Sequence, residues 1–334
     1  MAATRKNFWQ KLKKPIIALA PMADVTDAAF RRILVKYGKP DVLWTEFVSA
    51  DGLCSDGRQH LLLHLKYTQK EHPIIAQIFG SDPQKIKQAA RIIQDLKFDG
   101  LDINMGCPDR KILKQGAGAE LIKDFYLAKQ IIRAAKQGAP KIPISVKTRI
   151  GYNRIELKDW LINLLEEEVA AITIHGRTKK ELSLVPAHWD SIAEAVNIAR
   201  KFERNKKHQT IILGNGDVTG LKDAFSKIKQ SGVDGIMIGR GVFGNPWVFN
   251  KKRLGMEPTI KEKLNAMAEH TKLFEKLFKE KKSFNLMKKF FKAYVADFPG
   301  AGDLRKKLYA TTTAEGVSHI VRRALKDPQI GSIR

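Results

Sequence analysis

Two residues of this chain have types and positions that fit chemistry better than packing. Cys107 stands between Gly106 and Pro108, directly after the apolar run GLDINM. A cysteine in such a turn is poorly placed for a hydrophobic core, although burial in the core is the common fate of a free thiol. Lys147 lies inside another apolar run, ISVKTR. An unpaired ammonium is costly there, so we expect an anionic partner, either a structural carboxylate or a ligand.

Glycine-rich stretches follow two further apolar runs. They are Gly214–Asp217 (GNGD) and Gly239–Gly241 (GRG). Glycines let backbone amides approach an anion closely, and the positive end of a following helix adds to the attraction. The two stretches predict a phosphate site, with ordinary turn formation by glycine as the alternative.

Eight short runs rich in Val and Ile predict the strands that must position these residues. They are Pro15–Pro21, Asp41–Phe47, Pro73–Phe79, Gly100–Met105, Ile144–Arg149, Ala171–His175, Thr210–Gly214 and Gly235–Gly239. Between most of them lie segments with helical spacing, such as Asp82–Lys97, Glu120–Lys136, Glu156–Glu167 and Leu221–Gln230. Continuously apolar strands are typical of a parallel sheet that is buried on both faces. We therefore expect an α/β fold, a (β/α)8 TIM barrel, with a doubly wound open sheet as the alternative.

After Pro246 the pattern becomes helical. Leu264, Met267, Thr271, Phe274, Leu277 and Phe278 recur at helix spacing, and a second apolar stripe runs from Leu286 to Phe298 with Lys288, Lys289 and Lys292 on other faces. Two shorter helices are predicted around Asp303–Ala310 and Thr313–Leu325. We expect a barrel over residues 1–250 and a small all-helical C-terminal domain over residues 251–334. That domain has 20 basic and 9 acidic residues, a net charge of +11.

Composition limits the classes of function that remain. The 334 residues include 60 Lys and Arg against 35 Asp and Glu, a formal net charge of +25, which favours an anionic polymer such as nucleic acid as partner. A lysine-rich surface that only keeps the chain in solution is the alternative. No run approaches the ~20 apolar residues of a membrane span, and no signal-peptide core follows the basic N-terminus. Two cysteines are too few for a cysteine-rich metal site or a disulfide framework. We expect no membrane, no metal and a cytoplasmic location.

A resemblance to a known family follows from motifs that run along the predicted barrel. They are LAPMADVTDAAFR, AQIFGSDP, GLDINMGCPDRK, GAGAELIKD, VKTRIG, IHGRT, GNGDV and DGIMIGRGVFGNPW. These motifs resemble those of the tRNA-dihydrouridine synthases over roughly residues 15–250. The segment FFKAYVADFPGAGDLRKKL resembles the basic C-terminal domain of the same family. The sequence DINMGCP followed by VKTR is the most specific part of the match.

The resemblance implies a reaction, a cofactor and a partner. FMN, reduced by NADPH, would give a hydride from its N5 to C6 of a uridine in tRNA, and Cys107 would donate the proton to C5. A thiol with a pKa of about 8.5 holds a proton at neutral pH and can release it to a forming enolate. The target base must leave the tRNA stack to reach the barrel. A monomer is expected.

The resemblance also assigns residues to these roles. The cofactor-binding residues it implies are Pro21, Met22, Ala23, Gln77, Lys147, His175, Asn215, Gly216, Asp217, Gly239 and Arg240. Asn104 would bond flavin or uracil, and His175 is otherwise a satisfied structural histidine. Arg149 and Arg177 are expected to face the substrate opening, with a salt bridge on the barrel rim as the alternative.

Two other functions remain open from the sequence. A noncatalytic RNA-binding protein would use the positive charge alone and keep the barrel as a scaffold. A flavin oxidoreductase of the dihydroorotate dehydrogenase type would act on a small molecule. Such an enzyme has no evident need for the basic C-terminal segment.

Overall fold

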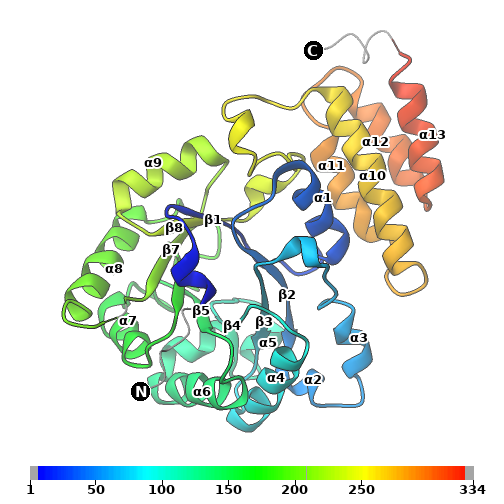
Figure 1. Ribbon diagram of the computed structural model, residues 1–334. Helices are drawn as coiled ribbons and strands as arrows, with labels where there is room; N and C mark the ends of the chain where they lie inside the picture. The colour runs from blue at the N-terminus through cyan, green and yellow to red at the C-terminus, as the bar shows by residue number, and fades with distance from the viewer. Residues whose placement is uncertain (1–6, 208, 328–334) are drawn as a thin grey trace.

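The chain folds into an eight-stranded parallel barrel with four helices after it, shown in the computed structural model of Figure 1, which describes residues 7–207 and 209–327. The strands are β1 (Ile16–Leu19), β2 (Leu43–Ser49), β3 (Ile74–Phe79), β4 (Gly100–Met105), β5 (Ile144–Arg149), β6 (Ala171–His175), β7 (Ile211–Asn215) and β8 (Gly235–Ile238). Their order in the sheet is β1-β8-β7-β6-β5-β4-β3-β2, and a parallel bridge between Ala18 and Val42 joins the two outer strands. The predicted TIM barrel is confirmed, and the open doubly wound sheet is wrong.

Helices return the chain between the strands. The α-helices of the barrel are α1 (Ala28–Gly38), α2 (Ala50–Leu53), α3 (Arg58–Leu62), α4 (Pro83–Asp95), α5 (Arg110–Leu113), α6 (Phe125–Gly138), α7 (Leu157–Glu166), α8 (Trp189–Phe202) and α9 (Leu221–Ser231). Short 3-10 helices are η1 (Phe8–Lys11), η2 (Gln69–Glu71), η3 (Gly118–Lys123), η4 (Arg240–Val242), η5 (Lys251–Arg253) and η6 (Phe284–Met287). The predicted helix Glu120–Lys136 begins later, at Phe125, because the Asp124 side chain accepts from the Leu127 amide and caps α6 there.

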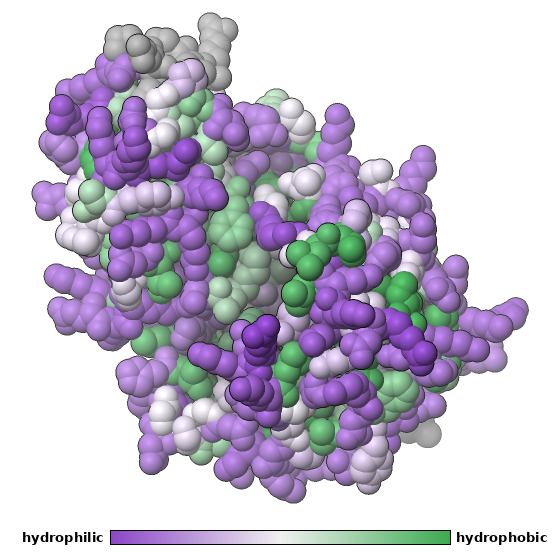
Figure 2. All heavy atoms as spheres, turned by 180° about the vertical axis from the view of Figure 1, so that it is seen from behind, coloured by the Kyte–Doolittle hydropathy of each residue, from purple (hydrophilic) through white to green (hydrophobic). Residues whose placement is uncertain are grey.

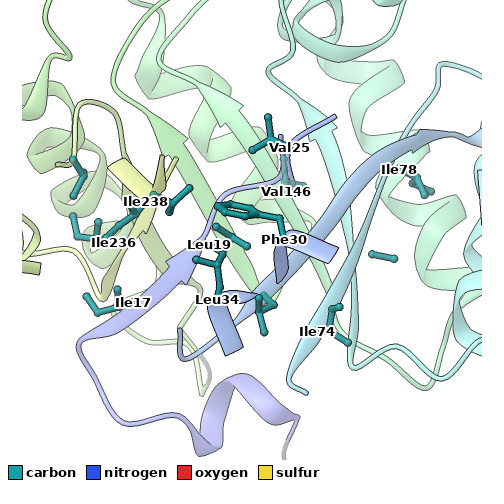
Figure 3. Packing of buried hydrophobic residues seen from close by; sticks show 14 of the residues in the cluster. Ile17, Leu19, Val25, Phe30, Leu34, Ile74, Ile78, Val146, Ile236 and Ile238 are labelled. Atoms are coloured by element: carbon teal, nitrogen blue, oxygen red, sulfur yellow. The ribbon is translucent and has the colours of Figure 1, made fainter. Parts of the chain in front are cut away.

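Side chains that alternate across each strand divide between two clusters. Outward residues such as Ile17 and Leu19 pack under α1 against Phe30 and Leu34 (Figure 3). Inward residues at the amino ends of the strands form a separate apolar cluster around Trp44. This alternation follows from the period of two along a strand, and it sends every second side chain into the barrel.

The amino end of the barrel is closed by η1. Trp9 is 2% exposed and packs against Trp44, with their ring centroids 5.9 Å apart. In Figure 1, η1 is the dark blue turn that lies across the barrel end facing the viewer. The opposite end, where the strands have their carboxyl ends, is therefore the open one.

The C-terminal helices α10 (Ile260–Phe278), α11 (Lys288–Tyr294), α12 (Ala301–Ala310) and α13 (Ala314–Ala324) pack beside α1 (Figure 1). Phe30 of α1 contacts the rings of His270 and Phe290, at centroid distances of 5.3 and 5.1 Å. One apolar cluster continues from the barrel into these helices. The division at residue 250 stays a prediction, since the change from strands to helices occurs there but the core does not end there.

The second apolar stripe of this segment differs from the prediction. Helix α11 ends at Tyr294, so Phe298 lies beyond it, and Asp297 has a left-handed backbone with φ of 64°.

No helix among residues 7–207 and 209–327 is long and apolar enough to cross a membrane.

Helix α10 carries a buried histidine whose replacement tests how the C-terminal helices pack. His270 is fully buried, and neither of its ring nitrogens has a hydrogen-bond partner in the part of the chain that the structure describes. Burial lowers its pKa to about 3. We expect His270→Leu to raise the free energy of unfolding by about 1 kcal/mol, because an unpaired imidazole is costly to bury.

Urea unfolding measures this change. Tyr294→Phe is the matched control, because the Tyr294 hydroxyl is also buried without a described partner and its loss should not destabilise the protein. A loss of about 1 kcal/mol or more in His270→Leu would mean that the imidazole is hydrogen-bonded in solution.

Candidate active site

A cavity of about 770 Å³ opens at the carboxyl ends of the strands. Eleven of the predicted site residues line it: Pro21, Met22, Lys147, Arg149, His175, Arg177, Asn215, Gly216, Asp217, Gly239 and Arg240. Figure 2 views the molecule from the end opposite η1, where a recessed strip of paler residues runs between the C-terminal helices and the barrel. The other four predicted residues do not line this cavity. Ala23 is exposed beside it, while Gln77, Asn104 and Cys107 belong to a hydrogen-bonded chain on β3 and β4.

That chain begins at Asp102 inside the barrel. Gln77 Nε2 donates to Asp102 Oδ2 at 2.6 Å, and Asn104 Nδ2 donates to Gln77 Oε1 at 3.1 Å. The side-chain oxygen of Asn104, Oδ1, accepts from the backbone amides of Gly106, at 3.1 Å, and Cys107, at 2.9 Å. A carboxylate can only accept and the two backbone amides can only donate, so both side-chain amides are held in one orientation.

Asp102 is the site residue that sequence reasoning missed. It is fully buried, and Ser145 Oγ donates to its second oxygen at 2.5 Å. Burial raises the pKa of Asp102 to about 6, against the hydrogen bonds from Gln77 and Ser145. The signal was present in GLDINM, because the period of two along a strand puts Asp102 on the same face as Asn104.

Lys147 of β5 is one of the residues that line the cavity. Its Nζ donates to Asn215 Oδ1 at 3.1 Å. The side-chain nitrogen of Asn215, Nδ2, donates in turn to the Met237 carbonyl at 2.8 Å. Burial, assisted by Arg149, lowers the pKa of Lys147 to about 8. The structural carboxylate considered as its partner is Asp102, which attracts Lys147 electrostatically, although the described hydrogen bond of the ammonium goes to Asn215. Its partly satisfied ammonium therefore faces a cavity that can hold an anion.

Cations surround His175 at the end of β6. Arg177 Nη1 lies 3.2 Å from His175 Nε2, and because a guanidinium can only donate, this nitrogen accepts. Burial, together with Lys147, Arg149 and Arg177, holds the pKa of His175 far below its ordinary value. The imidazole is therefore neutral, with its proton on Nδ1.

Asp217 joins the loops that follow β6 and β7. Its carboxylate forms an ion pair with Arg177, accepts from the Ala187 amide at 2.9 Å, and lies 3.0 Å from Arg240 Nη2. Burial opposes the charge of Asp217, but Arg177 outweighs it and lowers the pKa. Arg177 thus makes the rim salt bridge that was the alternative to substrate contact. Arg240 is the more available cation, with 65% of its side chain exposed.

Arg149 braces two loops. Its Nε donates to the Gly106 carbonyl at 2.7 Å, and its Nη1 donates to the carbonyls of Thr178, at 3.0 Å, and Leu182, at 3.2 Å. Only 6% of the residue is exposed. Neither the expected open substrate contact nor a rim salt bridge describes these bonds, although Arg149 still lines the cavity.

The two glycine-rich loops both line the cavity, the first with Asn215–Asp217 and the second with Gly239–Gly241. Gly216 has φ of 128°, which favours glycine, and an added Cβ would lie 2.7 Å from the Ala187 Cβ. Helix α9 begins at Leu221, shortly after the first loop, as expected. The second loop continues only into the three-residue η4 (Arg240–Val242), so no long helix adds its positive end there.

The backbone amide and the backbone carbonyl of Cys107 both form hydrogen bonds. Its amide donates to Asn104, and its carbonyl accepts from the Ala119 amide at 3.0 Å. Burial raises the pKa of the Cys107 thiol. Cys54 lies elsewhere, with its Sγ 3.5 Å from the Lys85 carbonyl oxygen between α2 and α4. No group of three or more His, Cys, Asp or Glu that could hold a metal ion occurs among the residues described.

Comparisons with known proteins identify a family for nearly the whole chain. A family model described as dihydrouridine synthase (Dus) matches residues 18–329. A probable tRNA-dihydrouridine synthase of Staphylococcus aureus (strain N315) is 39% identical over 310 residues, which are 92% of each chain. Probable tRNA-dihydrouridine synthase 2 of Bacillus subtilis (strain 168) is 38% identical over 325 residues, 96% of each chain.

Two solved structures share the fold. An old yellow enzyme homologue from Zymomonas mobilis superposes with a TM-score of 0.52 at 14% identity, covering 73% of this chain and 89% of the other. Morphinone reductase gives a TM-score of 0.53 at 10% identity, covering 75% and 88%. At these identities the likeness concerns the barrel alone.

The raised pKa of Cys107 predicts how its thiol reacts. A thiol whose pKa lies above its ordinary value is mostly protonated at neutral pH, and only the thiolate is alkylated. In a Cys54→Ala variant, we expect iodoacetamide to modify Cys107 slowly at pH 7 and at a rate still rising beyond pH 9. Mass spectrometry of the modified peptide follows the rate, and a plateau below pH 8 would contradict the assigned environment.

Proposed function

Because the chain belongs to the dihydrouridine synthase family, we propose that it reduces uridines of tRNA to dihydrouridine, with FMN as cofactor and NADPH as reductant. The observation that carries the proposal is the hydrogen-bonded chain that holds Cys107 beside a cavity with an excess of cations. A monomer, a cytoplasmic location and the preference for NADPH stay predictions.

The residues of the cavity fit FMN by their chemistry. Arg240 and the glycine-rich loop backbone would hold the phosphate, and the ammonium of Lys147 would lie at the pyrimidine edge of the isoalloxazine, where charge collects on reduction. Gln77 is fully buried outside the lining of the cavity, so its contribution to the site is to orient the side-chain amide of Asn104. When bound in its reduced form, the flavin supplies the hydride that adds to C6 of the uracil.

The protein's own residues handle the proton and the base. Burial keeps Cys107 protonated at neutral pH, so its thiol can donate the proton that C5 requires. Asn104 lies next to Cys107 and offers an amide to orient the uracil. Arg149 holds the carbonyl of Gly106, so its part in substrate binding is to fix the turn that carries Cys107.

Both alternative functions have less support. A noncatalytic RNA-binding protein needs no oriented chain of buried amides ending at the backbone of a protonated cysteine. A small-molecule flavin oxidoreductase needs no C-terminal segment with a net charge of +11. Purified protein that has no flavin absorbance and cannot be loaded with FMN would favour the RNA-binding protein.

Removal of the thiol is the central test. We expect Cys107→Ala to keep FMN and tRNA binding but to slow dihydrouridine formation by about 10²–10⁴-fold, the usual contribution of a positioned general acid. Single-turnover reoxidation of prereduced enzyme by tRNA gives the rate. Cys54→Ala is the control and should react as the parent protein does. A Cys107→Ala rate within about threefold of the parent would remove Cys107 from the mechanism.

The C-terminal lysines test where tRNA is held. Lys292 is exposed on α11, whereas Lys288 and Lys289 are half-buried, and Lys289 Nζ lies 5.8 Å from the Phe290 ring centre. Each phosphate contact contributes a slope of about −0.7 to −0.9 in log K against log salt. We expect Lys288→Gln with Lys292→Gln to flatten the slope by about 1.4 to 1.8 units while FMN binding survives.

Lysines at the closed end of the barrel provide the matched control. Lys201 and Lys207 are exposed there, and their replacement by Gln should leave the slope unchanged. Titration of tRNA at several salt concentrations makes the comparison. An unchanged slope in the α11 variant would place the tRNA contact on the barrel rim.

A further inference from the structure

A buried carboxylate on β2 collects hydrogen bonds from three separate parts of the chain. Glu46 Oε1 accepts from the Asp24 amide at 2.7 Å, and Oε2 lies 2.9 Å from His64 Nδ1 and 3.1 Å from Lys282 Nζ. The side chains of Glu46 and Lys282 are only 1% and 8% exposed. Burial would raise the pKa of Glu46, but His64 and Lys282 outweigh it and lower it to about 2.

Both parts of the chain supply charges at this junction, and His64 and Arg31 of the barrel act on Glu46 and Asp27. The barrel supplies the carboxylates of Asp24, Asp27 and Glu46, and the C-terminal segment supplies the ammonium groups of Lys282 and Lys289, which interact with them electrostatically. Burial, with Glu46 nearby, raises the pKa of Asp27 to about 6. Lys282 and Lys289 therefore add to the positive charge that His64 and Arg31 of the barrel bring to these carboxylates.

The bond to Asp24 fixes the loop that follows β1. Asp24 has φ of 56°, a left-handed conformation that is uncommon outside glycine, although Asp is among the residues that adopt it most readily. Its amide is held by Glu46, and the Met22 amide donates to Thr26 Oγ1 at 2.9 Å. Pro21 and Met22 of this loop form one wall of the cavity.

We propose that Lys282 is a positioning residue for the cofactor loop: through Glu46 it holds Asp24, and with it the wall formed by Pro21 and Met22. The inference rests on the proposed function, since it takes the cavity as the FMN site. It gives the C-terminal segment a part in cofactor binding besides contact with tRNA.

Docking of the C-terminal helices does not by itself require this pair. Phe30, His270 and Phe290 already form an apolar contact between α1 and the C-terminal helices. Taking two charges out of water is costly, so a pair of apolar residues would serve a purely structural junction as well. What the ion pair adds is a carboxylate with a defined orientation, whose second oxygen is aimed at the Asp24 amide.

The test compares FMN binding to the full-length apoprotein in the absence of tRNA. We expect Lys282→Met to weaken FMN binding about tenfold, because it removes the ammonium from the buried carboxylate of Glu46 and leaves His64 as the described side-chain partner. Lys282→Arg restores a cation and should bind within about twofold of the parent protein. Lys279→Met, an exposed lysine three residues earlier, is the matched control and should not change binding.

A double variant separates charge from packing. Glu46→Gln with Lys282→Met removes both charges and keeps an amide oxygen for Asp24, so FMN binding should return to within about threefold of the parent. If the double variant binds as weakly as Lys282→Met, the effect comes from lost packing and the proposal is wrong. If Lys282→Met does not fold, two double variants test the same bond. One combines Lys282→Met with Glu46→Gln, which keeps an oxygen for the Asp24 amide, and the other combines it with Glu46→Ala, which does not. Equal FMN affinity of the two double variants would overturn the proposal.

Hydrogen exchange provides a readout that does not depend on FMN. The peptide spanning residues 22–27 should exchange faster in Lys282→Met than in the parent or in Lys279→Met. Unchanged exchange together with FMN affinity within about twofold of the parent would overturn the proposal. Parent protein that binds no FMN would instead contradict the proposed function, and the exchange experiment would still decide whether Lys282 holds the loop.

Discussion

A polar side chain that points into a closed barrel must find its hydrogen-bond partners inside the barrel. Here Trp9 and Trp44 seal one end, so water cannot reach the polar residues on the inner faces of β3, β4 and β5 from that side. The result is a chain of hydrogen bonds in which every group donates toward Asp102. It starts at the backbone amide of Cys107 and passes through Asn104 and Gln77. The backbone of Cys107 is held because the buried side-chain amides of Gln77 and Asn104 have only one satisfactory orientation.

The same constraint distinguishes the cations of the site from one another. Arg149 is satisfied by backbone carbonyls and Arg177 by Asp217 and the Val185 carbonyl, so both work mainly as braces between loops. Lys147 donates its described hydrogen bond to the neutral Asn215, with the Asp102 carboxylate acting on it electrostatically, and Arg240 is largely exposed. The positive charge that remains available to a ligand therefore comes chiefly from these last two residues, which line the cavity together with His175 and Asn215.

The C-terminal helices are attached by two kinds of contact with different consequences. Aromatic packing around Phe290 supplies apolar burial but no orientation of the cavity. The Lys282 and Glu46 pair supplies little net attraction after its desolvation, yet it sets where a carboxylate points. A basic segment suited to tRNA is thereby connected to the loop beside the cavity, through one hydrogen bond to the Asp24 backbone.

The sequence by itself determined the eight strands, the helical C-terminal segment and the positions of Cys107 and Lys147, because apolar periodicity and strand ends are local properties. The period of two also contained Asp102, which was overlooked. Only the tertiary structure decided that Gln77 bonds Asp102, that Arg149 bonds carbonyls, and that Lys282 meets Glu46 from 236 residues away. Partners of buried polar groups depend on which strands and loops become neighbours, and no local pattern records that.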